Sequence, residues 1–402
     1  MTLWGCSNYG QNLQAYALQR FLRNAGHDAF LIRYPLIEYH DKRAVKYLKS
    51  FIKSSFSPPF VNFLYSLTGK KKTVSNIKNN PDMGVKKNPS APFAFYRDPS
   101  YLIHLRSIGN FLDTYINQSE SFYPSIEELK TAPPDADIYI TGSDQVWNFW
   151  GQPLTVAKHE TLDAFFLNFG KPETKRIAYA ASFGTRSIDK KSSEIIKPLI
   201  KNFSFVSIRE KSGLSLCESC GYRNAEWVPD PTLLLDKNHY RSLSRDLQSE
   251  KIKKPFCLVY MVRDNQDFLH KIYTWAGKNN FVICLITNSA LILHNYRETF
   301  ATIPEWIWLI DNAEYVITDS YHGSIFSLIF GKPFGIIPFD NCKNDLRLND
   351  LFKRFWLSFP LLDDTFSSFT TSDEINGISH ILNEIYRNYT FAWFNEIFSS
   401  KT

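Results

Sequence analysis

The sequence lacks the features that would place this chain in a membrane or on nucleic acid. It has no run of 18 apolar residues, so it predicts no membrane-spanning helix. Its start, Met1-Thr2-Leu3-Trp4-Gly5, has no basic stretch followed by an apolar core, so it predicts no signal peptide. The net charge of +6 over 402 residues is too small to indicate nucleic-acid binding. It suits an anionic small substrate or a loose attraction to an anionic membrane surface.

Several common catalytic patterns are also missing. A phosphate-loop glycine pattern and a dinucleotide fingerprint are absent, which disfavours binding of ATP or NAD through those motifs. There is no His-Glu-x-x-His pair and no nucleophile elbow. Six cysteines are scattered, and only Cys217-Glu-Ser-Cys220 has a close spacing, without a second pair or a histidine cluster that could hold zinc. We therefore expect no metal and no cofactor, incidental thiols, and a cytoplasmic protein.

The sequence does contain the apolar residues needed for a large core. The apolar fraction is 44%, and the chain has 33 Phe, 21 Tyr and 9 Trp. Because 402 residues exceed one ordinary core, we expect two domains. The polar, charged residues 236–254 predict the boundary, so the expected domains are 1–240 and 241–402, with helices at the end of the second. Short apolar runs alternate with helical patterns in both, which predicts an α/β fold with parallel sheets. The expected strands are 28–34, 138–141, 176–181, 203–208, 226–228, 256–261, 282–287, 315–318 and 334–337.

The first βαβ unit, residues 2–34, lacks most of its first strand. Thr2-Leu3-Trp4 is at most a fragment, and a polar turn and an amphipathic helix follow at once. Either the strand is short or the true start codon lies upstream. We favour the second interpretation, because a parallel strand that begins at the first residue has little to pair with.

Residues 36–100 interrupt the α/β pattern with a segment rich in Lys, Ser, Asn and Pro. Aromatic residues of 51–67 precede the run Lys70-Lys71-Lys72, a composition that could rest on an anionic membrane surface. We favour the alternative of a helical insertion that packs one apolar side and is followed by a mobile loop. A peripheral contact with the inner face of the membrane stays open.

Five polar turns follow apolar segments. Because the carboxyl ends of parallel strands share one edge of a sheet, these turns can line one crevice, and two facing domains would make it an interdomain cleft. In the last turn His322 can exchange a proton near neutral pH. A helix is expected from Ile325 to Phe330, and its amino end would offer N–H groups to an anion. The turns are Asn8-Tyr9-Gly10-Gln11, Gly142-Ser143-Asp144-Gln145, Ser182-Phe183-Gly184, Arg209-Glu210 and Asp319-Ser320-Tyr321-His322-Gly323.

Six motifs together resemble the polysaccharide pyruvyl transferases. They occur in family order from residue 8 to about 340: Asn-Tyr-Gly-x-x-Leu-Gln-Ala-Tyr-Ala-Leu-Gln (8–19), Gly-Ser-Asp-Gln-Val-Trp-Asn (142–148), Ala-Tyr-Ala-Ala-Ser-Phe-Gly (178–184), Ser-x-Arg-Glu (207–210), Asp-Pro-Thr-Leu-Leu (230–234) and Thr-Asp-Ser-Tyr-His-Gly (318–323). The resemblance implies two Rossmann-like domains facing across a cleft, similar to the GT-B glycosyltransferases. It also implies phosphoenolpyruvate as donor, and a glycan or lipid-linked sugar of a surface polysaccharide as acceptor, which would gain a pyruvate ketal.

The donor's chemistry then suggests roles for the turn residues. Phosphoenolpyruvate carries a phosphate and a carboxylate, which need cations or N–H groups. We expect Arg209 to supply one cation and the helix amino end at Gly323 and Ser324 to supply N–H groups. His322 and Asp144 are the expected acid and base. Tyr9 and Trp147 could stack on a sugar, although a buried Trp is more often part of the core. The remaining expected substrate-binding residues are Asn8, Gln11, Ser143, Gln145, Ser182 and Ser320.

One position departs from the family pattern. Some branches have an arginine two residues before the histidine, where this chain has Ser320. The candidates to supply the second cation are Arg176, Arg263, Lys332 and Arg347. We expect Asp319 to cap the following helix, and Asp230, between two prolines, to be structural.

Two other functions stay open on the sequence. One is a nucleotide-sugar-dependent glycosyltransferase on the same fold, which would need an acidic residue to hold a ribose. The other is a non-catalytic partner of glycan assembly, which the presence of His322 and Arg209 argues against.

Overall fold

The computed structural model describes residues 1–3, 8–34, 85–87, 95–97, 106–148, 156–245, 247, 255–288, 298–340, 342 and 345–399. Most of the insertion expected at 36–100 therefore lies outside the described residues, as does the turn that holds Cys6. Of the insertion, the structure describes β2 (Val85–Lys87) and β3 (Phe95–Arg97), which form an antiparallel pair. Both interpretations of the insertion stay predictions.

The first half of the chain builds a parallel four-stranded sheet in the order β5-β6-β7-β8. Its strands are Ile138–Thr141, Lys175–Ala181, Phe205–Ile208 and Glu226–Trp227, joined by α7 (Val156–Phe165), α8 (Lys190–Ile200) and α9 (Ser212–Ser219). A separate parallel pair consists of β1 (Leu31–Arg33) and β4 (Gln118–Phe122), with α5 (Ile108–Tyr115) before β4 and α6 (Ile126–Thr131) after it. The sequence did not predict β4.

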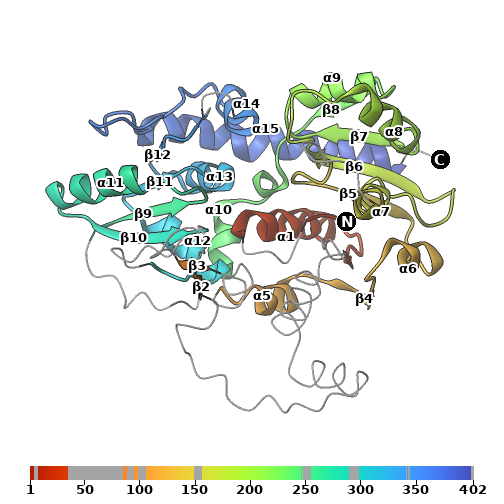
Figure 1. The fold of residues 1–402 in the computed structure, drawn as a ribbon, viewed down its shortest axis with the longest axis horizontal. Helices are drawn as coiled ribbons and strands as arrows, with labels where there is room; N and C mark the ends of the chain where they lie inside the picture. The colour runs from red at the N-terminus through yellow and green to blue at the C-terminus, as the bar shows by residue number, and fades with distance from the viewer. Residues whose placement is uncertain are drawn as a thin grey trace, which may run out of the picture.

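The second half builds another parallel sheet, in the order β10-β9-β11-β12. Its strands are β9 (Phe256–Met261), β10 (Val282–Thr287), β11 (Tyr315–Thr318) and β12 (Phe334–Ile336), and the helices are α11 (Gln266–Lys278), α12 (Ile303–Asn312), α13 (Tyr321–Phe330) and α14 (Leu346–Arg354). Alternate residues of β9 pack into two different cores, so helices cover both faces of the sheet. The two parallel sheets form separate lobes (Figure 1), which confirms the expected α/β fold with two Rossmann-like units.

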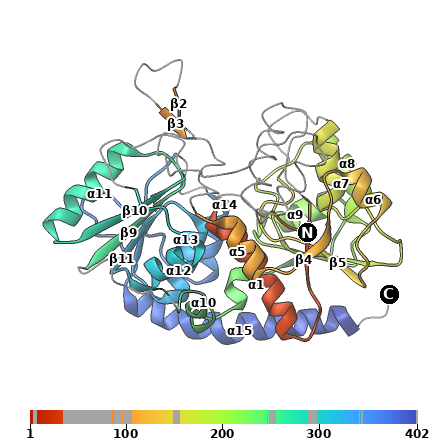
Figure 2. The same ribbon diagram turned by 90° about the horizontal axis from the view of Figure 1, so that it is seen from below.

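Two helices tie the lobes together. The last helix, α15 (Ser372–Ser399), runs along both (Figure 2), and its end packs Trp393, Phe394 and Ile397 beneath the first sheet. Helix α1 (Tyr9–Asn24) joins the same core through Leu18 and Leu22, while its first turn belongs to the core of the second lobe. The junction is completed by the 3-10 turn Pro231–Leu234 and α10 (Lys237–Leu243). The domain boundary near residue 240 stays a prediction.

Helix α13 starts earlier than the sequence predicted, at Tyr321 and not at Ile325. Ser320 is the N-cap of α13 and its hydroxyl accepts from the Gly323 amide at 3.2 Å, so Tyr321 and His322 lie in the first helical turn and not in a loop. The expected role of Asp319 as a cap was wrong. Its carboxylate instead accepts from the amides of Val262 and Arg263, at 2.6 and 2.8 Å, and joins the ends of β9 and β11.

None of the helices in the described parts of the chain has the length and apolarity needed to cross a membrane. Within those parts there is also no cluster of His, Cys, Asp and Glu suited to a metal ion. Cys217 and Cys220 are free, buried thiols.

Candidate active site where two helix amino ends meet

The amino ends of α1 and α13 meet at the junction of the two lobes. Asn8 caps α1 and Ser320 caps α13, each by accepting a backbone N–H with its side chain. Gly10, in the first turn of α1, lies directly against the ring of His322, where an added Cβ would overlap His322 Cγ and Nδ1. The missing side chain at position 10 therefore allows the two helices to approach. Both helix dipoles place partial positive charge at this point.

His322 is buried at this junction. Its side chain is only 5% exposed, and Nε2 lies 3.6 Å from Asp230 Oδ2. That distance is too long for a hydrogen bond, and Nε2 has no hydrogen-bond partner among the described residues. A buried ring nitrogen without a partner is available to a ligand or to a substrate proton.

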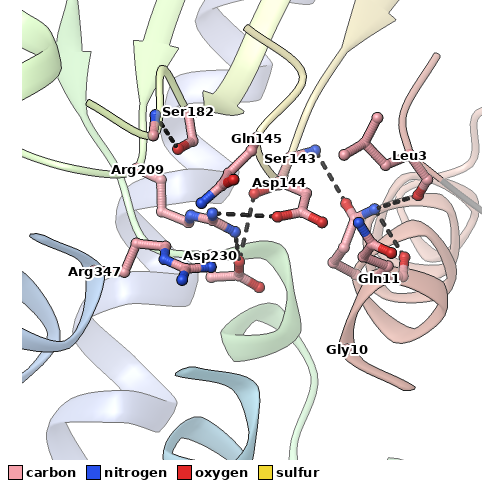
Figure 3. Close-up of polar contacts among 12 residues, drawn as sticks. Leu3, Gly10, Gln11, Ser143, Asp144, Gln145, Ser182, Arg209, Asp230 and Arg347 are labelled. Carbon is pink, nitrogen blue, oxygen red and sulfur yellow. Dashed lines mark hydrogen bonds and ion pairs between the residues drawn. The ribbon is translucent and has the colours of Figure 1, made fainter. Parts of the chain in front are cut away.

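Arg209, at the end of β7, is surrounded by three carboxylates (Figure 3). Its guanidinium lies 3.1 Å from Glu210, 3.0 Å from Asp230 and 3.3 Å from Asp144, and its side chain is 1% exposed. Burial alone would lower the pKa of Arg209, but the carboxylates outweigh it and raise that pKa well above its ordinary value. One guanidinium among three carboxylates leaves an excess of negative charge. Arg209 therefore organises the acidic residues and is not the open fork for a ligand anion that we expected.

Asp230 faces the site residues Arg209 and His322, although the sequence predicted only a structural role for it. The carboxylate is fully buried; Oδ1 accepts from the amide and hydroxyl of Thr232 at 3.0 and 2.7 Å, and Oδ2 faces Arg209 and His322. Burial alone would raise the pKa of Asp230, but His322 and Arg209 outweigh it and lower that pKa. The prolines on both sides had suggested a purely structural turn. The available signal was the position of Asp230 inside one of the shared motifs.

Asp144 follows β5 in an unusual backbone conformation. Its φ of 65° is left-handed, and the amides of Val146 and Ser182 both donate to its carbonyl, at 2.8 and 3.1 Å. This turn directs the Asp144 carboxylate toward Arg209 (Figure 3) and the α1 end, where the Gln11 side chain also bonds to it. Burial would raise the pKa of Asp144, but Arg209, His322 and Arg347 outweigh it and lower that pKa.

The two expected serines of the first lobe have their hydroxyls engaged by the protein. Ser143 donates to the Ala180 carbonyl at 2.9 Å, and Ser182 donates to Glu210 at 2.9 Å. Both are fully buried, so they support the strand ends beneath the acidic residues. Asn8, Gln11 and Gln145 are partly exposed and lie at the rim of the site.

The expected aromatic platform is wrong. Trp147 is fully buried, stacks on Phe166 with ring centroids 4.7 Å apart, and donates from Nε1 to the Phe165 carbonyl at 3.2 Å. Tyr9 is also fully buried and stacks on Trp306 at 5.1 Å. Neither ring has a face open to a sugar, because each is packed into a core.

The amides of Gly323 and Ser324, which we expected to bind an anion, already have acceptors within the protein. The Gly323 amide donates to the Ser320 hydroxyl and the Ser324 amide donates to the Ser320 carbonyl at 3.0 Å. The first four amides of a helix have no intrahelical acceptor, so the amides of Tyr321 and His322 replace those two as the candidates to bind an anion at α13.

Of the four candidates for the second cation, Arg347 is placed best. Its guanidinium lies 5.9 Å from the Tyr321 ring and 3.6 Å from Asp345 Oδ2, it extends toward Asp230 and Arg209 (Figure 3), and its side chain is 24% exposed. Arg176 is held by the carbonyls of Leu167, Phe169 and Thr174 at the opposite end of its strand, and Lys332 follows the far end of α13. Arg263 pairs with Asp319 and Asp345 and covers the Phe339 ring.

The comparison with known protein families agrees with this arrangement of motifs. A family model described as polysaccharide pyruvyl transferase matches residues 8–341. No curated protein matches the chain. Among solved structures, it is similar to UDP-GlcNAc 2-epimerase of Methanocaldococcus jannaschii, with 10% identity, a TM-score of 0.39, and coverage of 92% of this chain and 89% of that one. It is similar to the Neisseria meningitidis enzyme of the same name, with 8% identity, a TM-score of 0.42, and coverage of 95% and 91%.

Proposed function

The chain belongs to the polysaccharide pyruvyl transferase family, and from this premise we propose that it transfers the pyruvyl group of phosphoenolpyruvate to two hydroxyls of one sugar. The product is a pyruvate ketal on a surface polysaccharide or its lipid-linked precursor. The observation that carries the proposal is the family match over 8–341, which includes the residues that meet around His322. Because phosphoenolpyruvate is made in the cytoplasm, the reaction belongs there, and a lipid-linked acceptor would bring the enzyme to the membrane surface.

The donor's two anionic groups need positive charge on the side of His322 that faces away from the acidic residues. Arg347 supplies a partly exposed guanidinium, and the first amides of α13, at Tyr321 and His322, supply N–H groups. The excess of carboxylates around Arg209 would repel a bound phosphate. We therefore assign the donor anions to Arg347 and the α13 amides, and assign to Arg209 the holding of Asp144 and Asp230.

In the first step, His322 donates its proton to C3 of the donor, which becomes a methyl group. The electron pair of the C2–C3 double bond forms the new C–H bond, and C2 becomes an oxocarbenium-like centre. A sugar hydroxyl attacks C2 and passes its proton to Asp144, which is ionised because its pKa is lowered. The nearby Asp230 carboxylate stabilises the protonated imidazole before the transfer.

In the second step, the bond between C2 and the phosphate oxygen breaks and the phosphate leaves with the electron pair. The second sugar hydroxyl attacks C2 and closes the ketal. Two hydroxyl protons are released in all; one replaces the proton that His322 gave to C3, and the other leaves with inorganic phosphate. The donor, the sugar, His322 and Asp144 therefore account for all atoms and charges of the two steps.

The test is incubation of the protein with phosphoenolpyruvate and candidate acceptor glycans, with phosphate release and product mass as readouts. We expect a mass gain of one pyruvyl ketal per phosphate released. His322→Gln should abolish turnover, and Arg347→Ala should weaken phosphoenolpyruvate binding. Lys332→Ala is the matched control, because Lys332 lies beyond the other end of α13. Turnover with a nucleotide sugar but not with phosphoenolpyruvate would refute the proposal in favour of a glycosyltransferase.

A further inference from the structure

Arg106, which directly precedes the N-cap of α5, is one of the largest fully buried side chains in the described parts of the chain. Its guanidinium donates to the Thr287 carbonyl at 2.9 Å and to the side-chain oxygen of Asn288. Thr287 ends β10 and Asn288 follows it. The same guanidinium lies 4.4 Å from the centroid of the Tyr9 ring. Arg106 therefore joins the first residue of α1 to the carboxyl edge of the second sheet.

The Tyr9 ring is held on several sides within the core of the second lobe. It stacks on Trp306 of α12, with centroids 5.1 Å apart and planes 9° apart, and its hydroxyl donates to the Ala301 carbonyl at 2.7 Å. Trp306 in turn meets Phe326 of α13 edge to face at 5.0 Å. These contacts fix the first turn of α1 to the second lobe, although later turns of α1 pack in the core beneath the first sheet.

The two residues that follow Tyr9 reach the proposed acid and base. Gly10 lies against the His322 ring, and the Gln11 side chain bonds to the Asp144 carboxylate. His322 belongs to the second lobe and Asp144 to the first, so a single turn of α1 bridges them. Successive residues of an α-helix are fixed about 1.5 Å apart along its axis. A shift of Tyr9 would therefore move Gly10 and Gln11 with it.

Packing alone does not require an arginine at position 106. A charged group loses its hydration on burial, and apolar side chains of similar volume often fill such a position with equal or greater stability. An arginine offers two kinds of directional contact that an apolar side chain lacks. Its planar fork binds acceptors in defined directions, and its face stacks on an aromatic ring. These contacts restrict the position of Tyr9 more narrowly than apolar packing would.

We propose that Arg106 is a positioning residue that sets the distance between His322 and Asp144 through the first turn of α1. The proposal rests on the proposed function for the roles of those two residues, and it adds a residue that lies in none of the six motifs. Without the guanidinium, the first turn of α1 should shift. A misplacement of reacting groups by about 1 Å can lower a rate by about a hundredfold.

The experiment compares Arg106→Met with Arg176→Met in the full chain. Arg176 is the matched control, because its buried guanidinium also bonds to backbone carbonyls, those of Leu167 and Phe169, but lies at the end of β6 away from the site. We expect both variants to lower Tm by similar amounts. Only Arg106→Met should lower kcat for phosphate release, by about tenfold to a hundredfold. Its KM for phosphoenolpyruvate should stay within about twofold of the parent value, because Arg347 and the α13 amides hold the donor.

Tyr9→Leu tests the route by which Arg106 acts. This variant should lower kcat by a factor similar to that of Arg106→Met, and combining the two should lower kcat by less than about threefold further. Arg106→Lys keeps a cation beside the ring but loses the fork. Its kcat should lie between those of Arg106→Met and the parent protein, and it serves as the test variant if Arg106→Met does not fold.

Hydrogen exchange separates this proposal from the proposed function. The amides of residues 13–16 bond to the carbonyls of the first α1 turn, so their exchange reports on that turn whatever the substrate is. We expect exchange there to be about tenfold faster in Arg106→Met than in Arg176→Met. Equal exchange in these two variants, an unchanged kcat in Arg106→Met, or a full further loss of kcat in the Tyr9→Leu background would overturn the positioning role. If the parent protein does not turn over phosphoenolpyruvate, the proposed function fails, and the exchange comparison alone decides whether Arg106 holds α1.

Discussion

Replacing Asp230 by asparagine tests whether the negative charge of Asp230 supports the proposed role of His322. The substitution keeps the shape of the side chain and Oδ1, which accepts from Thr232, but removes the negative charge 3.6 Å from His322 Nε2. Two opposite unit charges at that distance attract by roughly 4–5 kcal/mol at an effective dielectric constant of about 20. Losing even half of this attraction, about 2 kcal/mol, corresponds to about a 30-fold lower rate.

Two quantities should therefore change in Asp230→Asn. We expect kcat for phosphate release from phosphoenolpyruvate to fall by about 30-fold or more near neutral pH. The free energy of unfolding should fall by about 3 kcal/mol, the lower end of the cost of breaking a buried ion pair, because Arg209 keeps Asp144 and Glu210.

Glu210→Gln is the matched control. Glu210 is also buried and lies 3.1 Å from Arg209, close to the 3.0 Å of Asp230, but the structure gives it no contact with His322 among the described residues. We expect a similar loss of stability by urea titration and a nearly unchanged kcat. If both variants have the same kcat, Asp230 acts only through Arg209 and the pairing with His322 is wrong.

Three further changes probe other parts of the molecule. Gly10→Ala should push α1 away from His322 and lower kcat by about tenfold to a hundredfold, whereas Gly277→Ala, on the open face of α11, should leave kcat unchanged and stabilise by up to about 1 kcal/mol. Trp147→Phe should cost about 2 kcal/mol in urea titration, because a core contact and a hydrogen bond are lost, and should leave the acceptor KM unchanged. The Met1 amine has a pKa of about 5 when folded and 8.0 as its ordinary value, so the unfolded chain binds more protons between them. In a protein with a free Met1 amine, stability should rise from pH 5 to 8 by up to about 4 kcal/mol, and N-terminal acetylation should remove that part of the pH dependence.

Each of these expectations has an outcome that contradicts it. Unchanged kcat in Gly10→Ala would show that the contact between α1 and His322 does not matter for turnover. A raised acceptor KM with unchanged stability in Trp147→Phe would restore this ring as a sugar platform. An identical pH dependence of the free and acetylated proteins would mean that the Met1 amine is solvated.

The sequence predicted those elements whose pattern is local. The strands 256–261, 282–287 and 315–318 were predicted with the bounds that the structure has, because a parallel strand covered on both faces is a short continuous apolar run. The strand Gln118–Phe122 was missed because it is mostly polar and only Ser119 in it is buried, which resembles a loop. The start of α13 was missed because a capped first turn of polar residues also resembles a loop.

The motifs likewise placed most of the site residues at strand ends, since parallel strands share one carboxyl edge. The motifs could not show which of these side chains are already paired within the protein and which remain accessible to a ligand. The motif alone suggested that Arg209 binds a ligand anion. In the structure its guanidinium is paired with the carboxylates of Asp144, Glu210 and Asp230. Arg347, which no motif contains, lies beside these residues because α14 carries it there.

The order of most strands and helices and the family were thus determined by the sequence. The tertiary structure alone decided that Tyr9 and Trp147 belong to cores, that Asp230 faces His322, and that a cavity of about 120 Å³ lies between β1 and β5. The physical reason is that burial, ion pairing and sheet order depend on distances between residues far apart in the chain. Local patterns of apolar and polar residues carry no information about those distances.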